Sequence, residues 1–152
     1  MRRTVLKSKI HRAIVTETNI HYEGSLSIDA DLLDAADILP FEQIHVWDVT
    51  NGSRIITYAI LGERGTGIIQ VNGGGTHHIK KGDVVIIATF TDLKSRDAKK
   101  HKPRVILVDR ENHIKAADDH DNDVDSAPET DPEPTVEVVA KPRRTAKRKP
   151  IV

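Results

Sequence analysis

The chain has 152 residues, no cysteine, and 23 basic against 23 acidic residues, which suits one domain with a single core and a tail. The lack of cysteine excludes disulfide bonds and thiolate zinc sites, and no run approaches the roughly 20 apolar residues of a membrane-spanning helix. We therefore expect a soluble, cytoplasmic protein with no membrane segment.

Short segments rich in β-branched residues dominate the first 30 residues, as is typical of strands. Three extended segments are predicted there: residues 4–9, 13–18 and 27–29. A short helix is predicted at residues 31–36, because good helix formers follow acidic residues that suit the positive end of a helix dipole. Pro40 would end this helix.

Asn51-Gly52 predicts a tight turn, since both residues tolerate positive φ. It would join two strands, residues 43–49 and 54–61. Alternation in the second strand gives two faces, one with Arg54, Ile56 and Tyr58 and the other with Ile55, Thr57 and Ala59. Further strands are predicted at residues 68–71, 83–90 and 104–109. Many short strands, one short helix and glycine-rich turns predict a small, mainly β barrel.

From residue 116 onward the composition changes. Five of the seven prolines lie there, residues 118–137 hold nine acidic residues and no Lys or Arg, and residues 141–149 hold six basic residues. Such a segment cannot bury enough apolar surface to offset the entropy of ordering it, so residues 116–152 are predicted to be a disordered tail. Its basic end could contact nucleic acid. The simpler interpretation, a solvated tail attracted to its own acidic block, is preferred.

The pair Gly24-Ser25 by itself is ordinary turn chemistry. Its context is more informative, because six segments follow one another in a distinctive order: residues 7–12, 21–25, 51–58, 62–65, 72–73 and 82–88. Together, over residues 1–115, they resemble the pyruvoyl-dependent aspartate decarboxylase family. Six co-linear segments are far more specific than any one of them.

The resemblance implies a fold and an activity. Residues 1–115 would form a six-stranded double-psi β-barrel with one or two short helices. The chain would cut itself between Gly24 and Ser25, giving residues 1–24 and 25–152, and would turn Ser25 into a covalent pyruvoyl group. Through a Schiff base to that group it would convert L-aspartate to β-alanine and CO2 for pantothenate and coenzyme A synthesis. The cleaved protomers would form a homotetramer, and the need for an accessory maturation factor is left open.

The resemblance also assigns roles to single residues. Ser25 would carry the pyruvoyl group, and Tyr58 would donate the proton that replaces CO2. Self-processing would involve Gly24, Ser25, Thr57 and Tyr22. Substrate binding would involve Lys9, His11, Arg54, Thr57, Asn72, Gly73, Gly74 and Gly75.

The residue types suit these roles. Gly24 permits a bend that exposes its carbonyl, and the Thr57 hydroxyl can donate a hydrogen bond to an oxygen that becomes negative. Arg54 can hold a carboxylate bidentately. Family members usually have alanine at positions 74 and 75; glycine keeps the backbone N–H groups but makes this loop more flexible.

Alternative functions fit less well. Nothing indicates a pyridoxal phosphate enzyme, and no metal site is expected, because adjacent histidines such as His77 and His78 point to opposite faces of a strand. A hydrolase using Ser25 would need a Gly-x-Ser-x-Gly turn, which is absent. The main rival is a non-catalytic β-barrel binding module with a basic nucleic-acid-binding tail. Seven intact positions favour the enzyme: Lys9, Gly24, Ser25, Arg54, Thr57, Tyr58 and Asn72.

Overall fold

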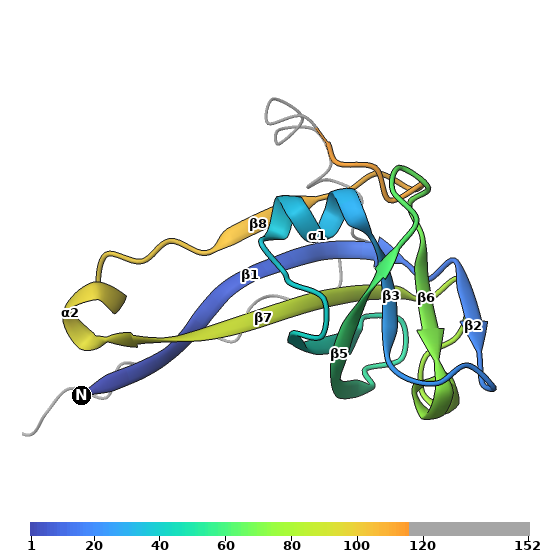
Figure 1. Cartoon of the computed structure of the whole chain (residues 1–152), viewed down its shortest axis with the longest axis horizontal. Helices are drawn as coiled ribbons and strands as arrows, with labels where there is room; N and C mark the ends of the chain where they lie inside the picture. The colour runs from blue at the N-terminus through green and yellow to red at the C-terminus, as the bar shows by residue number, and fades with distance from the viewer. Residues whose placement is uncertain (116–152) are drawn as a thin grey trace, which may run out of the picture. The chain divides into compact units, whose positions relative to one another are not determined.

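The computed structural model describes residues 1–115, and the predicted disordered tail lies outside them. Within the described residues there are eight strands and three short helices (Figure 1). The strands are β1 (Arg2–Ile14), β2 (Glu17–Asn19), β3 (Leu26–Asp29), β4 (Gln43–Asp48), β5 (Arg54–Gly62), β6 (Ile69–Asn72), β7 (Val84–Lys94) and β8 (Arg104–Leu107). The helices are α1 (Ala30–Ala36), the 3₁₀ helix η1 (Gly73–His77) and α2 (Ser95–Ala98). No helix in this part of the chain is long and apolar enough to cross a membrane.

The strands form one sheet in the order β2-β6-β3-β5-β4-β7-β1-β8. Antiparallel pairs join β1 to β7, β4 to β5 and β7, and β3 to β6, whereas β1–β8, β2–β6 and β3–β5 are parallel. This mainly β structure with few helices confirms the predicted fold class and agrees with a small double-psi β-barrel, although the described residues form eight strands and six were expected. The short strands β2 and β8 lie at the two ends of the order.

The first strand differs from the sequence prediction, which placed two strands at residues 4–9 and 13–18. A single strand, β1, runs from Arg2 to Ile14 and pairs with β7, the next longest strand of the described residues (Figure 1). It continues because the register shifts between Ile10 and Ala13, where Arg12 has a φ of 60°. A bulge of this kind absorbs extra residues without ending the pairing.

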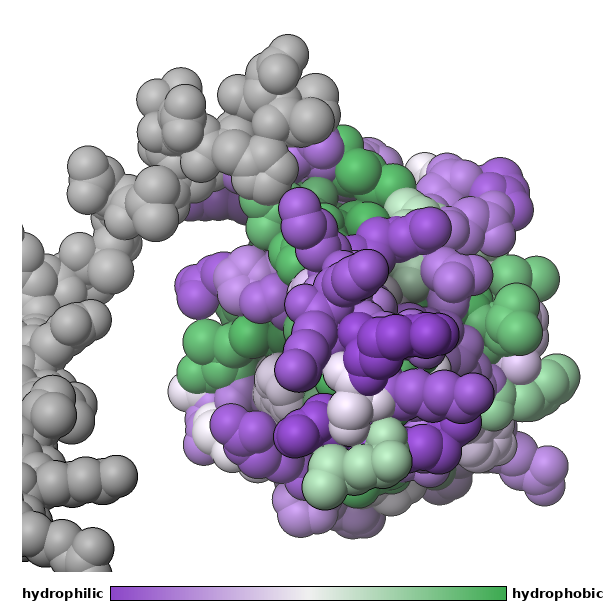
Figure 2. All heavy atoms as spheres, turned by 90° about the vertical axis from the view of Figure 1, so that its left-hand side faces the viewer, coloured by the Kyte–Doolittle hydropathy of each residue, from purple (hydrophilic) through white to green (hydrophobic). Residues whose placement is uncertain are grey.

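The core lies where the inward faces of the strands meet α1. Its largest fully buried side chains are Ile10, Leu26, Ile28, Leu32, Leu33, Ile44, Ile69, Ile79, Ile87, Val15, Val46 and Val71. The strand β4 alternates buried side chains with more exposed ones, as a sheet with one buried face requires, whereas β2 is exposed throughout. By contrast, α2 buries no residue. The end of the molecule that carries α2 is largely hydrophilic (Figure 2).

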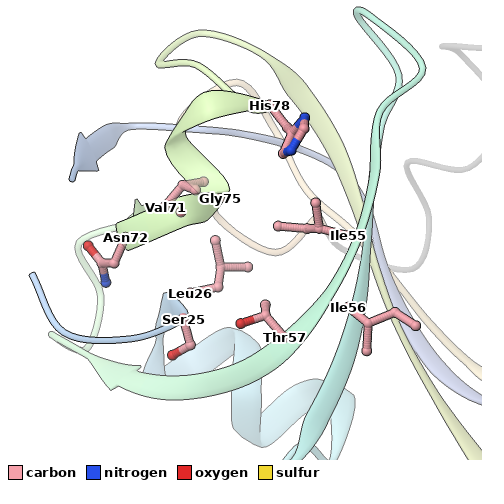
Figure 3. A pocket seen from close by; sticks show the side chains of 10 residues that line it. Ser25, Leu26, Ile55, Ile56, Thr57, Val71, Asn72, Gly75 and His78 are labelled. Carbon is pink, nitrogen blue, oxygen red and sulfur yellow. The ribbon is translucent and has the colours of Figure 1, made fainter.

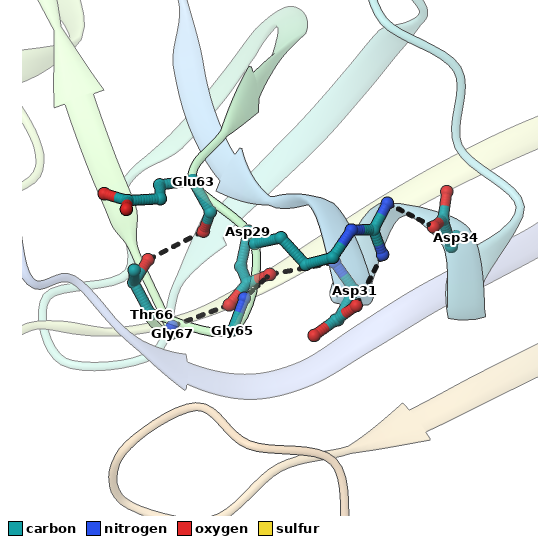
Figure 4. Close-up of polar contacts among 8 residues, drawn as sticks. Asp29, Asp31, Asp34, Glu63, Gly65, Thr66 and Gly67 are labelled. Carbon is teal, nitrogen blue, oxygen red and sulfur yellow. Dashed lines mark hydrogen bonds and ion pairs between the residues drawn. The ribbon is translucent and has the colours of Figure 1, made fainter.

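Asp29 connects β3, α1 and the loop after β5 (Figure 4). Its buried carboxylate accepts the backbone N–H groups of Asp31 at 2.8 Å, Gly65 at 3.0 Å and Gly67 at 2.6 Å. Burial alone would raise the pKa of Asp29, but these three donors and the nearby Arg64 guanidinium outweigh it and hold the pKa below its ordinary value. The carboxylate thereby fixes the end of the strand that begins at Leu26.

We expect Asp29→Asn to destabilise the fold by about 1–3 kcal/mol at pH 7, because an amide must turn an NH2 group toward a backbone N–H. The folded-state pKa of Asp29 is depressed, so its stabilisation is present above the unfolded value of about 3.9 and is lost as the pH falls through the folded value. Urea unfolding between pH 7 and strongly acidic pH should therefore show the two proteins converging in acid. An equal difference at every pH would contradict this account.

Asp34→Asn is the matched control for this prediction. Asp34 forms an exposed ion pair with Arg64 at 2.9 Å. Exposed pairs contribute little, so the change in unfolding free energy should stay below about 1 kcal/mol.

Candidate active site

The Gly24–Ser25 bond lies in the loop between β2 and β3, directly before the first residue of β3. Gly24 has a φ of 95° and Ser25 a φ of 27°. Positive φ is uncommon for a residue with a side chain. The Ser25 carbonyl accepts the Asn72 backbone N–H at 3.0 Å, which fixes this bend against β6. The Ser25 hydroxyl is buried and has no hydrogen-bond partner among the described residues, so it is not engaged in holding the fold.

Gly24 packs directly against the hydroxyl group of Tyr58. A Cβ atom at position 24 would overlap that oxygen, so the Tyr58 side chain would have to move, and the positive φ of Gly24 also favours glycine. The approach follows from the parallel pairing of β3 with β5, in which Leu26 lies opposite Ala59. Tyr58 Oη therefore lies beside the Gly24–Ser25 bond, a proximity that the strand pattern alone did not predict.

A cavity of about 200 Å³ opens beside Ser25 (Figure 3). Its polar lining consists of Ser25, Thr57, Asn72 and His78, its apolar lining of Leu26, Ile55, Ile56 and Val71, and Gly74 and Gly75 form the turn that closes it. Ser25 and Thr57 lie close together at one end, and His78 lies at the other (Figure 3). Of the residues expected to bind substrate, four line this cavity: Thr57, Asn72, Gly74 and Gly75.

Four expected substrate-binding residues do not line the cavity: Lys9, His11, Arg54 and Gly73. Lys9 lies opposite Ala88 on β7 and follows the alternation of β1, in which the next residue, Ile10, is fully buried. Lys9 therefore points to the outer face of the sheet. Arg54, also exposed, has its guanidinium carbon 5.1 Å from the centre of the Trp47 ring.

The outer face is positively charged. Lys9 and His11 are two residues apart on β1 and share this face. Burial, followed by the charges of Lys9 and Arg12, lowers the pKa of His11, and its Nδ1 is buried with no hydrogen-bond partner among the described residues. Neither Lys9 nor Arg54 has an ion pair within residues 1–115. These side chains are therefore free to meet an anionic group.

Residues 1–115 match a protein family described as "Aspartate decarboxylase". The chain belongs to the aspartate decarboxylase family. It is 52% identical over 120 residues to a protein named aspartate 1-decarboxylase from Albidiferax ferrireducens, covering 79% of this chain and 89% of that protein. It is 51% identical over 115 residues to a protein of the same name from Syntrophus aciditrophicus, covering 76% of this chain and 99% of that protein.

Among solved structures, the chain is similar to the computationally designed msDPBB_sym2 protein, with a TM-score of 0.35 and 17% identity over 56% of this chain and 96% of that one. The sequence match carries the family assignment and confirms the expected resemblance.

The structure accounts for one of the two glycines at positions 74 and 75, where the resemblance led us to expect alanine. A Cβ at Gly75 would lie 3.1 Å from Val71 Cγ1 and 3.2 Å from Ile55 Cδ1, both in the cavity wall. An alanine there would force one of them to shift. A Cβ at Gly74 would meet nothing within 4 Å, so the structure does not require that glycine. Gly73 has a φ of 58°, which favours glycine.

The positions of Tyr22, His78 and Ile55 differ from what the sequence led us to expect. Tyr22, expected to help shape the bend, is half exposed, and its backbone N–H donates to the Asn19 carbonyl at 3.4 Å. His78 lines the cavity, although the sequence raised it only as a possible metal ligand. The cavity position of Ile55 could have been inferred from the strand alternation that it shares with Thr57.

Proposed function

We propose that this chain decarboxylates L-aspartate to β-alanine and CO2 after cutting itself between Gly24 and Ser25 and converting Ser25 to a pyruvoyl group. The observation that carries the proposal is the buried, unpartnered Ser25 hydroxyl beside a positive-φ glycine that packs against Tyr58. Two relatives that are about half identical are named aspartate 1-decarboxylase. The β-alanine would serve pantothenate and coenzyme A synthesis.

Self-processing begins when Ser25 Oγ attacks the Gly24 carbonyl carbon. The C–N bond breaks, and an ester joins Gly24 to the side chain of residue 25, whose amine is now free. Loss of the α-proton expels the Gly24 carboxylate and leaves dehydroalanine, and water then releases ammonia and leaves a ketone. The Tyr58 hydroxyl lies against Gly24 and Thr57 lines the cavity beside Ser25, so either hydroxyl could donate to the oxygen that becomes negative in the first step.

The residues around the Gly24–Ser25 bond fit a pyruvoyl group at position 25. The Ser25 hydroxyl, which has no hydrogen-bond partner among the described residues, lies in a cavity that has room for a small acid. Such a ketone supplies the electron sink that amino-acid decarboxylation needs. The chain supplies the remaining functions. Asn72 and the backbone N–H groups of Gly74 and Gly75 bind anionic oxygens of the substrate, and Tyr58 holds the proton that is returned to the carbon that loses CO2.

A second copy of the chain would complete the site. A hollow of about 510 Å³ is lined by Phe41, Gln43, Ile56, Thr57 and Tyr58. Ile56 and Thr57 also line the cavity, so the two spaces adjoin. The hollow is apolar and exposed, with Phe41 75% and Ile56 63% accessible, as is common where a subunit covers another.

The outer face of a neighbouring copy carries the cations that the cavity lacks. Lys9 and Arg54 of a copy docked at the hollow would reach the cavity and bind the carboxylates of aspartate, and His11, whose pKa is lowered, would join them as a neutral hydrogen-bond donor. We therefore propose a homotetramer in which each site lies between two copies. This arrangement accounts for the separation of the substrate-binding residues within one copy.

Intact-mass spectrometry of the purified protein, with an assay of aspartate turnover, tests the proposal. We expect a short chain ending at Gly24 and a long chain lighter, by one ammonia, than a chain that begins with serine. β-Alanine and CO2 should form in equal amounts. An uncut chain that turns over aspartate, or activity that depends on added pyridoxal phosphate, would contradict it.

A further inference from the structure

We infer that Gln70 is a positioning residue that sets the orientation of the Asn72 side-chain amide; the inference rests on the proposed function. Gln70 Nε2 donates to Asn72 Oδ1 at 2.7 Å, and Asn72 Nδ2 donates to Ser27 Oγ at 3.2 Å. Asn72 is 3% exposed, so water does not compete for these bonds. The three side chains form a short chain of hydrogen bonds with Asn72 in the middle.

The strand register places these residues together. Gln70 and Asn72 are two residues apart on β6 and share a face, and Ser27 on β3 lies directly opposite Gln70. The backbone N–H of Asn72 donates to the Ser25 carbonyl at 3.0 Å. Asn72 is therefore joined to residue 25 through its main chain, while its side chain is held by two neighbours on the same face.

The orientation of the amide has a chemical consequence. The two ends of an asparagine amide have nearly the same shape, but one end donates hydrogen bonds and the other accepts them. Because Gln70 Nε2 donates to Asn72 Oδ1, Asn72 Nδ2 points away from Gln70. Ser27 takes one of the two Nδ2 hydrogens. We infer that the other is offered to an anionic oxygen of a substrate bound at residue 25. In the reversed orientation the lone pairs of Oδ1 would face that oxygen and repel it.

Two substitutions separate the possible effects. Gln70→Met removes the donor and keeps the length of the side chain, whereas Gln70→Glu replaces the donor with an acceptor of the same shape and favours the reversed amide. We expect Gln70→Met to raise the KM for aspartate roughly fivefold, the equivalent of one hydrogen bond, and Gln70→Glu to raise it further. The value of kcat per cleaved chain should change less than about twofold, because the group that reacts is untouched.

Succinate provides a readout that does not depend on turnover, because it carries two carboxylates and no amine. Its Kd, measured by calorimetry on the full chain, should rise in parallel with the KM. Glu17 lies opposite Gln70 on β2 and is exposed, so Glu17→Gln is the matched control and should change neither quantity. Thermal unfolding and the cleaved fraction by intact mass identify any variant that fails to fold or mature. If Gln70→Glu fails in this way, the comparison of Gln70→Met with the wild type decides.

A double-mutant comparison distinguishes positioning from general stabilisation. If Gln70 acts through Asn72, then Gln70→Met should leave the succinate Kd unchanged in an Asn72→Ala background. An equal rise of the Kd with and without Asn72 would overturn the inference, as would an unchanged Kd and KM in Gln70→Met. Failure of the wild-type chain to cleave or to decarboxylate aspartate would count against the proposed function. If the wild-type chain is cleaved and active but Gln70→Met changes neither the succinate Kd nor the KM, only this inference fails.

Discussion

Ser25→Ala should leave the chain in one piece and reduce aspartate decarboxylation to the background rate. Without the hydroxyl group nothing attacks the Gly24 carbonyl, so no ketone forms and the electron sink is missing. The variant should fold, because the Ser25 hydroxyl has no hydrogen-bond partner in the described structure and its removal leaves no polar group unpaired. Intact mass and a CO2 assay on the same preparation measure both effects.

Ser53→Ala is the matched control for this loss. Ser53 lies in the turn between β4 and β5 and does not line the cavity. The variant should mature and turn over aspartate as the unmodified chain does. If Ser25→Ala were found cut at position 24, or if it retained turnover, another residue would have to supply the nucleophile and the pyruvoyl proposal would fail.

At aspartate concentrations well below the KM of Arg54→Ala, co-expression of Ser25→Ala with Arg54→Ala should restore activity that the first variant lacks and the second largely loses. Arg54→Ala by itself should raise the KM for aspartate roughly ten- to hundredfold, because a charged hydrogen-bond donor to a carboxylate is lost. In oligomers that mix the two variants at random, about one quarter of the sites would pair an intact Ser25 with the intact Arg54 of a neighbour. The activity per total chain should therefore be about one quarter of that of the unmodified chain.

The complementation experiment depends on the separation of Arg54 from the cavity within one copy. Arg64→Ala serves as the control, because Arg64 pairs with Asp31 and Asp34 on α1, and we expect that variant to be active without a partner. If co-expression restored nothing although both variants assembled together, Arg54 would have to act within its own copy. Each site would then not be shared between copies.

Several features of this protein follow from the sequence by itself. Local pattern was sufficient for the mainly β class, for the turn at Asn51-Gly52 and for the strands on either side of it. The alternation along β5 correctly separated Arg54 from Thr57, which the structure places on different faces. These features depend on short-range periodicity, and periodicity is a property that a sequence displays directly.

Other features were decided only by the tertiary structure. The contact of Gly24 with the Tyr58 hydroxyl arises because β3 pairs in parallel with β5, and the hydrogen bonds of Gln70, Asn72 and Ser27 arise from the register of β3 with β6. Alternation specifies which face a side chain occupies but not which strand lies beside it. Pairing partners and register depend on burying all the inward faces at once, so they emerge only when the whole sheet has formed.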